Sequence, residues 1–212
     1  MFKVLFPNLR SENVMLLDIN KDVFDTIKII VNDQIELARS KKFLQNLYLY
    51  NINLAGHLEE EYALPENKYL LDLLERACEK YHSIFKLERE LKGPFSGIHS
   101  SMTWINVMRK TEYNPIHRHH NAHISWVMWV KIPYDLKNED SLPNTKKANT
   151  KANGRFEFIS IDAAGMFTEY INLDKSYEGR LCLFPTSLHH QVYPFYTSDD
   201  TRISLAGNIT LK

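Results

Sequence analysis

Four of the nine histidines lie close together in the stretch NPIHRHHNAHISW, residues 114–126. They are His117, His119, His120 and His123. Alternate side chains of an extended segment share a face, so His117 and His119 point one way and His120 points the other. Two imidazoles on one face can chelate a transition metal. The spacing leaves His123 unassigned, because the chain can turn before it.

A second pair of histidines lies in LFPTSLHHQVYP, residues 183–194. Gly179, Pro185 and His190 form the pattern G-x5-P-x4-H, which predicts a turn, a strand, a second turn and a histidine that enters the next strand. Neighbouring strand residues point in opposite directions, so only one of His189 and His190 can face a site. The spacing favours His190 as a third imidazole.

Other interpretations of these histidines stay open. Histidines are common on protein surfaces, and the first stretch could be a solvated segment without a metal. The chain also holds one H-x-E sequence, His57-Leu58-Glu59, as a second candidate ligand pair. It lies in AGHLEEEY, upstream of the β-rich part, and we interpret it as polar surface.

The elements that must position these residues differ between the two halves of the chain. Two short extended pieces, residues 2–6 and 13–19, precede two segments with apolar residues at helical spacing, Lys21 to about Lys42 and residues 66–93. After Gly97 short β-rich runs follow one another. These runs are residues 103–109, 124–133, 155–161, 180–185, 191–196 and 202–211. Many short strands predict a β-sandwich or barrel.

The polar stretch DLKNEDSLPNTKKANTKANG, residues 135–154, has no hydrophobic period. We expect an exposed or mobile loop there. Two roles are open for it: a solvated connection, or a lid over an active site.

The chain of 212 residues is 44% hydrophobic and has a formal net charge of zero. We interpret residues 1–212 as one domain, with a helical part at 1–95 and a β core at 96–212. The charge balance gives no sign of general nucleic-acid or membrane binding. No run of about eighteen apolar residues occurs, and Cys78 and Cys182 lack thiolate metal spacing. We therefore expect a soluble cytoplasmic protein.

The order of these motifs resembles the 2-oxoglutarate- and Fe(II)-dependent oxygenases. The resemblance rests on H-x-H, ISWVMWVKIP, NGRFEFI, G-x5-P, the distal histidine and R-x-S near the end, and covers roughly residues 98–210. It is strongest to an oxygenase family of bacteria and their viruses whose members carry an H-x-H pair. The resemblance implies a mainly β fold, a double-stranded β-helix or cupin-like jelly roll, with the N-terminal amphipathic helices packed on it.

Matched position by position, the resemblance implies that His117 and His190 are metal ligands. It also implies that Arg202 and Ser204 lie at the 2-oxoglutarate site. A guanidinium can bind a carboxylate through two parallel hydrogen bonds. A hydroxyl two residues away lies on the same strand face. The alternative for Arg202 is an exposed side chain, or a surface ion pair with Asp199 or Asp200.

Two further residues are candidates for contacts with 2-oxoglutarate or substrate. Asn106 lies in the run TWINVMR, and Tyr113 directly precedes the H-x-H segment. Both could instead be ordinary sheet or turn residues.

The sequence departs from the usual pattern at the middle ligand. His119 stands where most of the superfamily has a carboxylate, and a neutral imidazole suits Zn, Ni or Cu as well as Fe.

The resemblance implies an enzyme that couples oxidative decarboxylation of 2-oxoglutarate, with Fe(II) and oxygen, to C–H oxidation of an unknown substrate. The alternative is a cupin-like metal-binding protein with a three-histidine Zn or Ni site that catalyses no oxygenation. A third interpretation makes the N-terminal helices an interaction module, and whether two copies form a homodimer stays open.

Overall fold

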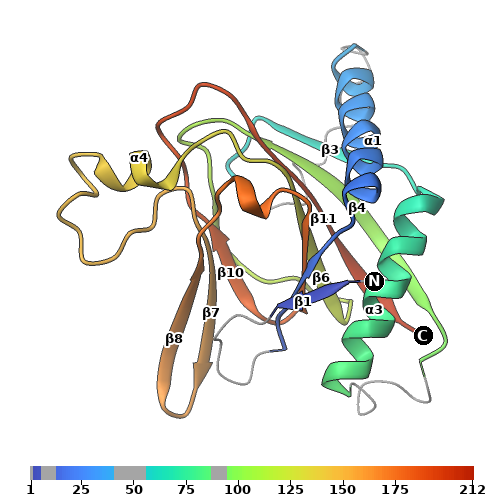
Figure 1. Ribbon diagram of the computed structural model, residues 1–212. Helices are drawn as coiled ribbons and strands as arrows, with labels where there is room; N and C mark the ends of the chain where they lie inside the picture. Colours follow the sequence, from blue (N-terminus) through green and yellow to red (C-terminus); the bar gives the residue numbers. More distant parts are fainter. Residues whose placement is uncertain (1, 6–12, 41–55, 87–94) are drawn as a thin grey trace.

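The computed structural model describes residues 2–5, 13–40, 56–86 and 95–212 (Figure 1). Their strands form two antiparallel sheets. The larger has the order β1-β2-β9-β6-β11-β4-β3, and the smaller has the order β5-β10-β7-β8. The prediction of a mainly β chain is confirmed. No helix in the described part is long and apolar enough to cross a membrane.

The bounds of the elements are as follows. The larger sheet consists of β1 (Lys3–Leu5), β2 (Met15–Asp18), β9 (Arg180–Pro185), β6 (Ile124–Lys131), β11 (Arg202–Leu211), β4 (Ile98–Met108) and β3 (Glu60–Leu64). The smaller consists of β5 (Asn114–His117), β10 (His189–Val192), β7 (Phe156–Asp162) and β8 (Gly165–Ile171). The helices are α1 (Lys21–Ser40), α3 (Lys68–Phe85), α4 (Leu136–Ser141) and the 3-10 turn η4 (Lys175–Tyr177).

The centre of the larger sheet is buried on both faces. In β6, Met128 and Val130 belong to a core cluster that includes apolar residues of α1 and α3, whereas Val127 and Trp129 belong to a second cluster with Phe156 of the smaller sheet. A strand covered on both sides needs apolar residues at every position. This explains why ISWVMWV is almost continuously apolar rather than alternating.

Helices α1 and α3 lie on the side of the larger sheet that faces away from the smaller sheet (Figure 1). Asn67 caps the start of α3, where its side chain accepts a hydrogen bond from Leu70 N–H. The helix ends at Phe85, and Lys86 after it has a left-handed backbone with φ of 53°. The predicted helix over residues 66–93 is confirmed for Lys68–Phe85, and residues 87–94 lie outside the described part.

Two strands were not predicted. The expected polar surface AGHLEEEY contains the start of β3, which pairs with β4, and β8 completes a hairpin with β7. In β3, Glu61 and Tyr62 are both buried, on opposite faces of the strand. The run of three glutamates concealed this strand, because charged residues normally indicate exposure.

Most side chains of residues 135–154 are exposed, as expected, but the segment is anchored to the core. The buried Glu139 carboxylate accepts hydrogen bonds from the backbone N–H groups of Tyr196 and Thr197. Arg155 forms two parallel hydrogen bonds with Asp140, at 2.7 and 2.8 Å. The segment lacks a hydrophobic period, and hydrogen bonds and an ion pair of charged side chains hold it against the core instead.

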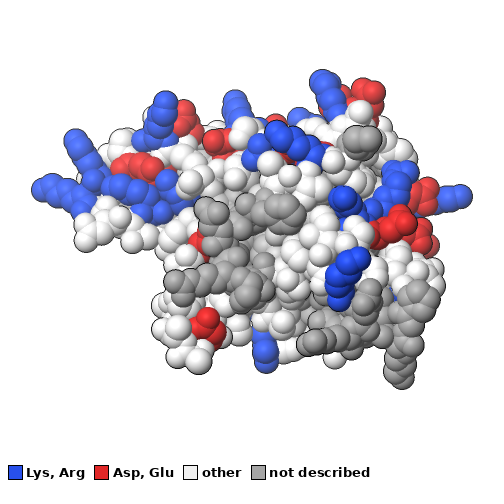
Figure 2. Space-filling view, turned by 60° about the horizontal axis from the view of Figure 1, so that its bottom comes forward, with Lys and Arg blue, Asp and Glu red and all other residues white. Residues whose placement is uncertain are grey.

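Basic side chains gather on this projecting segment, at the left of Figure 2. They are Lys137, Lys146, Lys147 and Lys151. Elsewhere on the face shown, many of the basic side chains lie next to acidic ones.

Candidate active site

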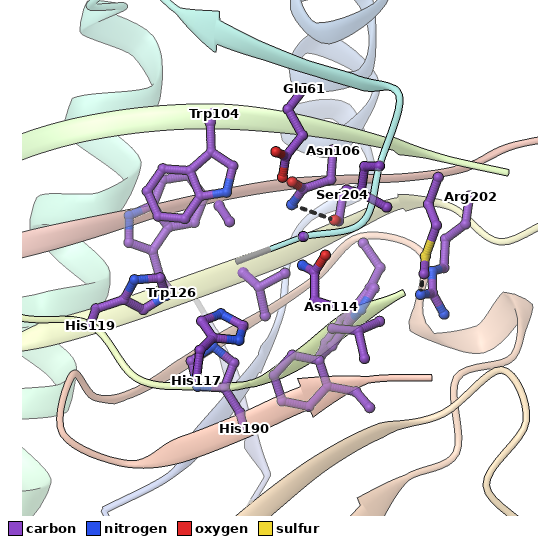
Figure 3. A pocket seen from close by; sticks show the side chains of 18 of the residues that line it. Glu61, Trp104, Asn106, Asn114, His117, His119, Trp126, His190, Arg202 and Ser204 are labelled. Carbon is purple, nitrogen blue, oxygen red and sulfur yellow. Dashed lines mark hydrogen bonds between the residues drawn. The ribbon is translucent and has the colours of Figure 1, made fainter. Parts of the chain in front are cut away.

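The three predicted histidines converge at one end of a pocket between the sheets (Figure 3). His190 of β10 lies opposite His117, the last residue of β5. His119 lies just beyond β5, where its backbone N–H donates to Thr186 O at 2.9 Å. One potential ligand nitrogen from each ring lies within 4.8 Å of the other two. Strand pairing thus unites residues that are far apart in the sequence.

Two of the rings are oriented by backbone carbonyls. His117 Nδ1 lies 2.7 Å from Pro115 O, and His190 Nδ1 lies 3.0 Å from Leu188 O. A carbonyl oxygen can only accept a hydrogen bond, so each Nδ1 must carry the proton. The lone pair of each Nε2 is then free, which is the usual arrangement of histidines that bind metals.

Burial also keeps the three imidazoles neutral. It lowers the pKa of His117, lowers the pKa of His119 to about 4, and lowers the pKa of His190 well below its ordinary value. The neighbouring imidazoles add to the lowering for His119 and His190. At neutral pH the cluster offers unprotonated nitrogens to a cation.

The other candidate histidines lie elsewhere. His120 is exposed, and His123 points away from the cluster because its Nδ1 accepts a hydrogen bond from Leu211 N–H at 3.0 Å. His57 and Glu59 are exposed, as expected for polar surface.

Tyr113 lies outside the residues that line the pocket. Its exposed ring stacks on His57, with centroids 4.6 Å apart. Its predicted role toward 2-oxoglutarate stays a prediction.

The far end of the pocket holds Arg202, whose side chain is 3% exposed. The guanidinium donates to the hydroxyl of Tyr134 at 2.8 Å and to the carbonyls of Gly154 and Tyr193, and contacts the sulfur of Met108. All four partners are uncharged. Within the described part of the chain no carboxylate pairs with this buried cation.

The alternative for Arg202, a surface ion pair, does not occur. Asp199 pairs with Lys110, and Asp200 pairs with Lys131. Because an unpaired buried charge is costly, a cation in this position favours an anionic ligand.

Gly154, at the end of the polar segment, helps to position Arg202. Its carbonyl accepts hydrogen bonds from both Arg202 and the Tyr134 hydroxyl. Its φ of +71° lies in the left-handed region, and a Cβ would lie 2.6 Å from Tyr134 Cε2. The backbone there requires glycine.

The pocket between the two ends is partly open to solvent. Apolar side chains line much of it. They are Leu58, Met108, Val127, Phe156, Phe184, Val192 and Ala206, with Trp104, Trp126 and Trp129. Polar side chains lie among them: Asn106 faces Ser204 on the adjacent strand, and its Nδ2 donates to Ser204 Oγ at 3.3 Å.

Glu61, which was not among the predicted site residues, also lines the pocket (Figure 3). Its side chain is 1% exposed and lies opposite Asn106. Burial, with a smaller contribution from Glu112, raises the pKa of Glu61 to about 8. Tyr62 and Leu64 lie two positions apart, and this spacing of apolar residues was the sequence pattern that could have predicted a strand here.

Comparison with known proteins identifies the family. Residues 102–208 match the model of the family described as "Putative 2OG-Fe(II) oxygenase". This match covers half of the chain, and the chain belongs to that family of 2-oxoglutarate- and Fe(II)-dependent oxygenases. No protein in the curated set matches the chain.

Solved structures support the fold. A viral collagen prolyl hydroxylase from Paramecium Bursaria Chlorella virus-1 has a TM-score of 0.55 at 10% identity, covering 94% of this chain and 96% of that one. A prolyl-4-hydroxylase from Pseudomonas putida has a TM-score of 0.53 at 12% identity, covering 95% and 94%. At these identities the likeness concerns the fold, which is the double-stranded β-helix of the oxygenases.

Proposed function

We propose that the protein is a 2-oxoglutarate-dependent dioxygenase in which His117, His119 and His190 bind Fe(II). The observation that carries the proposal is the pairing of three neutral imidazoles with a buried, anion-free Arg202 at opposite ends of one pocket. A metal and a dicarboxylate together would satisfy both ends. Family membership supports the same cofactor and cosubstrate.

The donor set fits Fe(II), since imidazole nitrogens are common ligands of iron, zinc, nickel and copper. When bound, the metal would supply the oxygen chemistry of the reaction. The carbonyls of Pro115 and Leu188 hold Nδ1 of two imidazoles, which leaves their Nε2 atoms as the nitrogens that would bind the metal. His119 in place of a carboxylate leaves the ligand set without a negative charge of its own.

Arg202 would bind the remote carboxylate of 2-oxoglutarate, with Ser204 and Asn106 contributing hydrogen bonds along its length. Support comes from their shared face on β11 and β4 and from the Asn106–Ser204 contact. The apolar lining around them would exclude water from the reacting groups.

Succinate formation tests this function against the zinc-binding alternative. Purified protein should convert 2-oxoglutarate to succinate only when Fe(II) and oxygen are present. Elemental analysis and calorimetry complete the test. Full zinc occupancy combined with no heat of 2-oxoglutarate binding would overturn the proposal and favour a non-oxygenase metal protein.

We infer that α1 and α3 serve to cover the larger sheet rather than to bind a partner. Their buried residues belong to the same core cluster as residues of β4, β6 and β11. Burial of each such aliphatic side chain stabilises a fold by about 1.5–3 kcal/mol. The sheet itself therefore accounts for the apolar faces of both helices.

A further inference from the structure

One wall of the pocket carries buried oxygen atoms that lack hydrogen-bond donors. In the described part of the chain these include both carboxyl oxygens of Glu61 and the amide oxygens of Asn106 and Asn114. Buried polar groups in native proteins are nearly always paired, so such a cluster needs a physical explanation. A ligand that brings donors to this wall would provide one.

Two of these residues face the same small volume. A Cβ placed on Gly56 would lie 2.5 Å from Asn114 Oδ1 and 3.2 Å from Glu61 Oε1. Figure 3 shows the Asn114 amide directed toward the side of the pocket that holds Glu61 and Asn106. The oxygens therefore form one acceptor surface, contributed by β3 and β5.

Neighbouring side chains do not satisfy this surface. Asn106 lies opposite Glu61, but its amide nitrogen donates to Ser204 Oγ. The like charge of Glu112 adds to the raised pKa of Glu61 and disfavours ionisation of its carboxyl group. Arg202 makes its hydrogen bonds to other groups.

The chemistry of the wall selects a particular kind of ligand group. Several acceptors and one ionisable acid complement a cation that carries several N–H donors. Hydrogen bonds between charged groups are stronger than neutral ones, and the low-dielectric setting strengthens them further. A carboxylate or phosphate group placed directly against an ionised Glu61 would be repelled.

We propose that Glu61 and Asn114 bind an ammonium or guanidinium group of the primary substrate. This assignment rests on the proposed function, because a group held on this wall would lie in the pocket that contains the three histidines and would present its neighbouring C–H bonds there. The raised pKa of Glu61 agrees with a carboxyl that is neutral in the free protein and ionises when a cation arrives.

Four small probes test the proposal in protein loaded with Fe(II) and 2-oxoglutarate without oxygen. Butylammonium and butylguanidinium carry charge and N–H donors, butylurea carries donors without charge, and tetramethylammonium carries charge without donors. We expect calorimetry to show at least tenfold tighter binding of butylguanidinium than of butylurea, and weak binding of tetramethylammonium. Equal affinities for the guanidinium and the urea would overturn the proposal.

Glu61→Gln supplies the matched variant, with Glu36→Gln on the exposed face of α1 as its control. The first substitution should reduce the guanidinium preference to less than twofold, and the control should preserve it. Affinity for 2-oxoglutarate is measured in the same samples. If Glu61→Gln weakens only 2-oxoglutarate binding, Glu61 serves the cosubstrate and the substrate assignment is wrong. Absence of metal-dependent 2-oxoglutarate binding in the wild-type protein would instead overturn the proposed function.

Discussion

The histidine end and the Arg202 end of the pocket differ in the charge of the ligand that would complete each of them. At the histidine end, one buried and two half-buried neutral rings offer lone pairs, so this end is suited to a cation. At the other end, a buried guanidinium has only neutral partners, so this end is suited to an anion. The two ends of the pocket therefore complement ligand groups of opposite charge.

The two ends are also built differently. The histidines come from the smaller sheet and the turn after β5, where backbone carbonyls fix the rings. Arg202 comes from the larger sheet and is fixed by Tyr134, which precedes the polar segment, and by Gly154, its last residue. Substitutions at one end should therefore affect one ligand and leave the other largely unchanged.

The largest effect is expected for His190→Ala, which removes the most buried of the three rings. Loss of a group that supports a metal site costs about 10- to 100-fold in affinity, and loss of a ligand itself should reach at least the upper figure. Metal titration of the purified variant measures this. His189→Ala, at the adjacent position whose side chain points the other way, should stay within a factor of two of the wild type. Comparable losses in both variants would contradict the assignment of His190.

Arg202→Met tests the opposite end. The hydrogen bonds of a charged group contribute about 1.5–3 kcal/mol, which corresponds to roughly a 10- to 100-fold loss of 2-oxoglutarate affinity. Metal affinity should change by less than twofold. Lys131→Met is a suitable control, since Lys131 lies at the end of β6 and pairs with Asp200. Unchanged 2-oxoglutarate affinity in Arg202→Met would contradict the assignment of an anionic ligand to this end of the pocket.

A smaller effect is expected for Gly154→Ala. The left-handed backbone costs a non-glycine residue about 1–2 kcal/mol, and the new Cβ would press on the Tyr134 ring. The melting temperature should fall, and 2-oxoglutarate affinity should decrease several-fold with metal affinity preserved. Gly165→Ala, which also has positive φ but nothing within 4 Å of the added Cβ, separates backbone strain from contact with Tyr134. Equal effects of both substitutions on 2-oxoglutarate would show that Gly154 does not position Arg202.

Spacing and parity indicated that His117, His119 and His190 could converge, and in the structure the three rings lie together. Strand alternation correctly placed His120 outside the cluster, and the G-x5-P-x4-H spacing correctly favoured the inward-facing His190. These inferences succeeded because local backbone geometry determines the side of a strand on which a residue lies.

The opposite wall could not be predicted in the same way. Glu61 reaches the pocket only because β3 pairs with β4 at the sheet edge, and this pairing has no local sequence signal. Likewise, the anchoring of residues 135–154 by Glu139 depends on backbone donors more than fifty residues away. The burial of these carboxyl groups depends on segments that are distant in the sequence, and it cannot be inferred from the residue type.

The effect of bound Fe(II) on 2-oxoglutarate affinity in the wild-type protein tests most directly whether one pocket holds both ligands. Calorimetric titration of 2-oxoglutarate is carried out without oxygen, once in metal-free protein and once after loading with Fe(II). One dicarboxylate that spans both ends should bind at least tenfold more tightly in the loaded protein, and Arg202→Met should weaken binding in both states. Identical affinities with and without Fe(II) would contradict the claim that one pocket holds both ligands together.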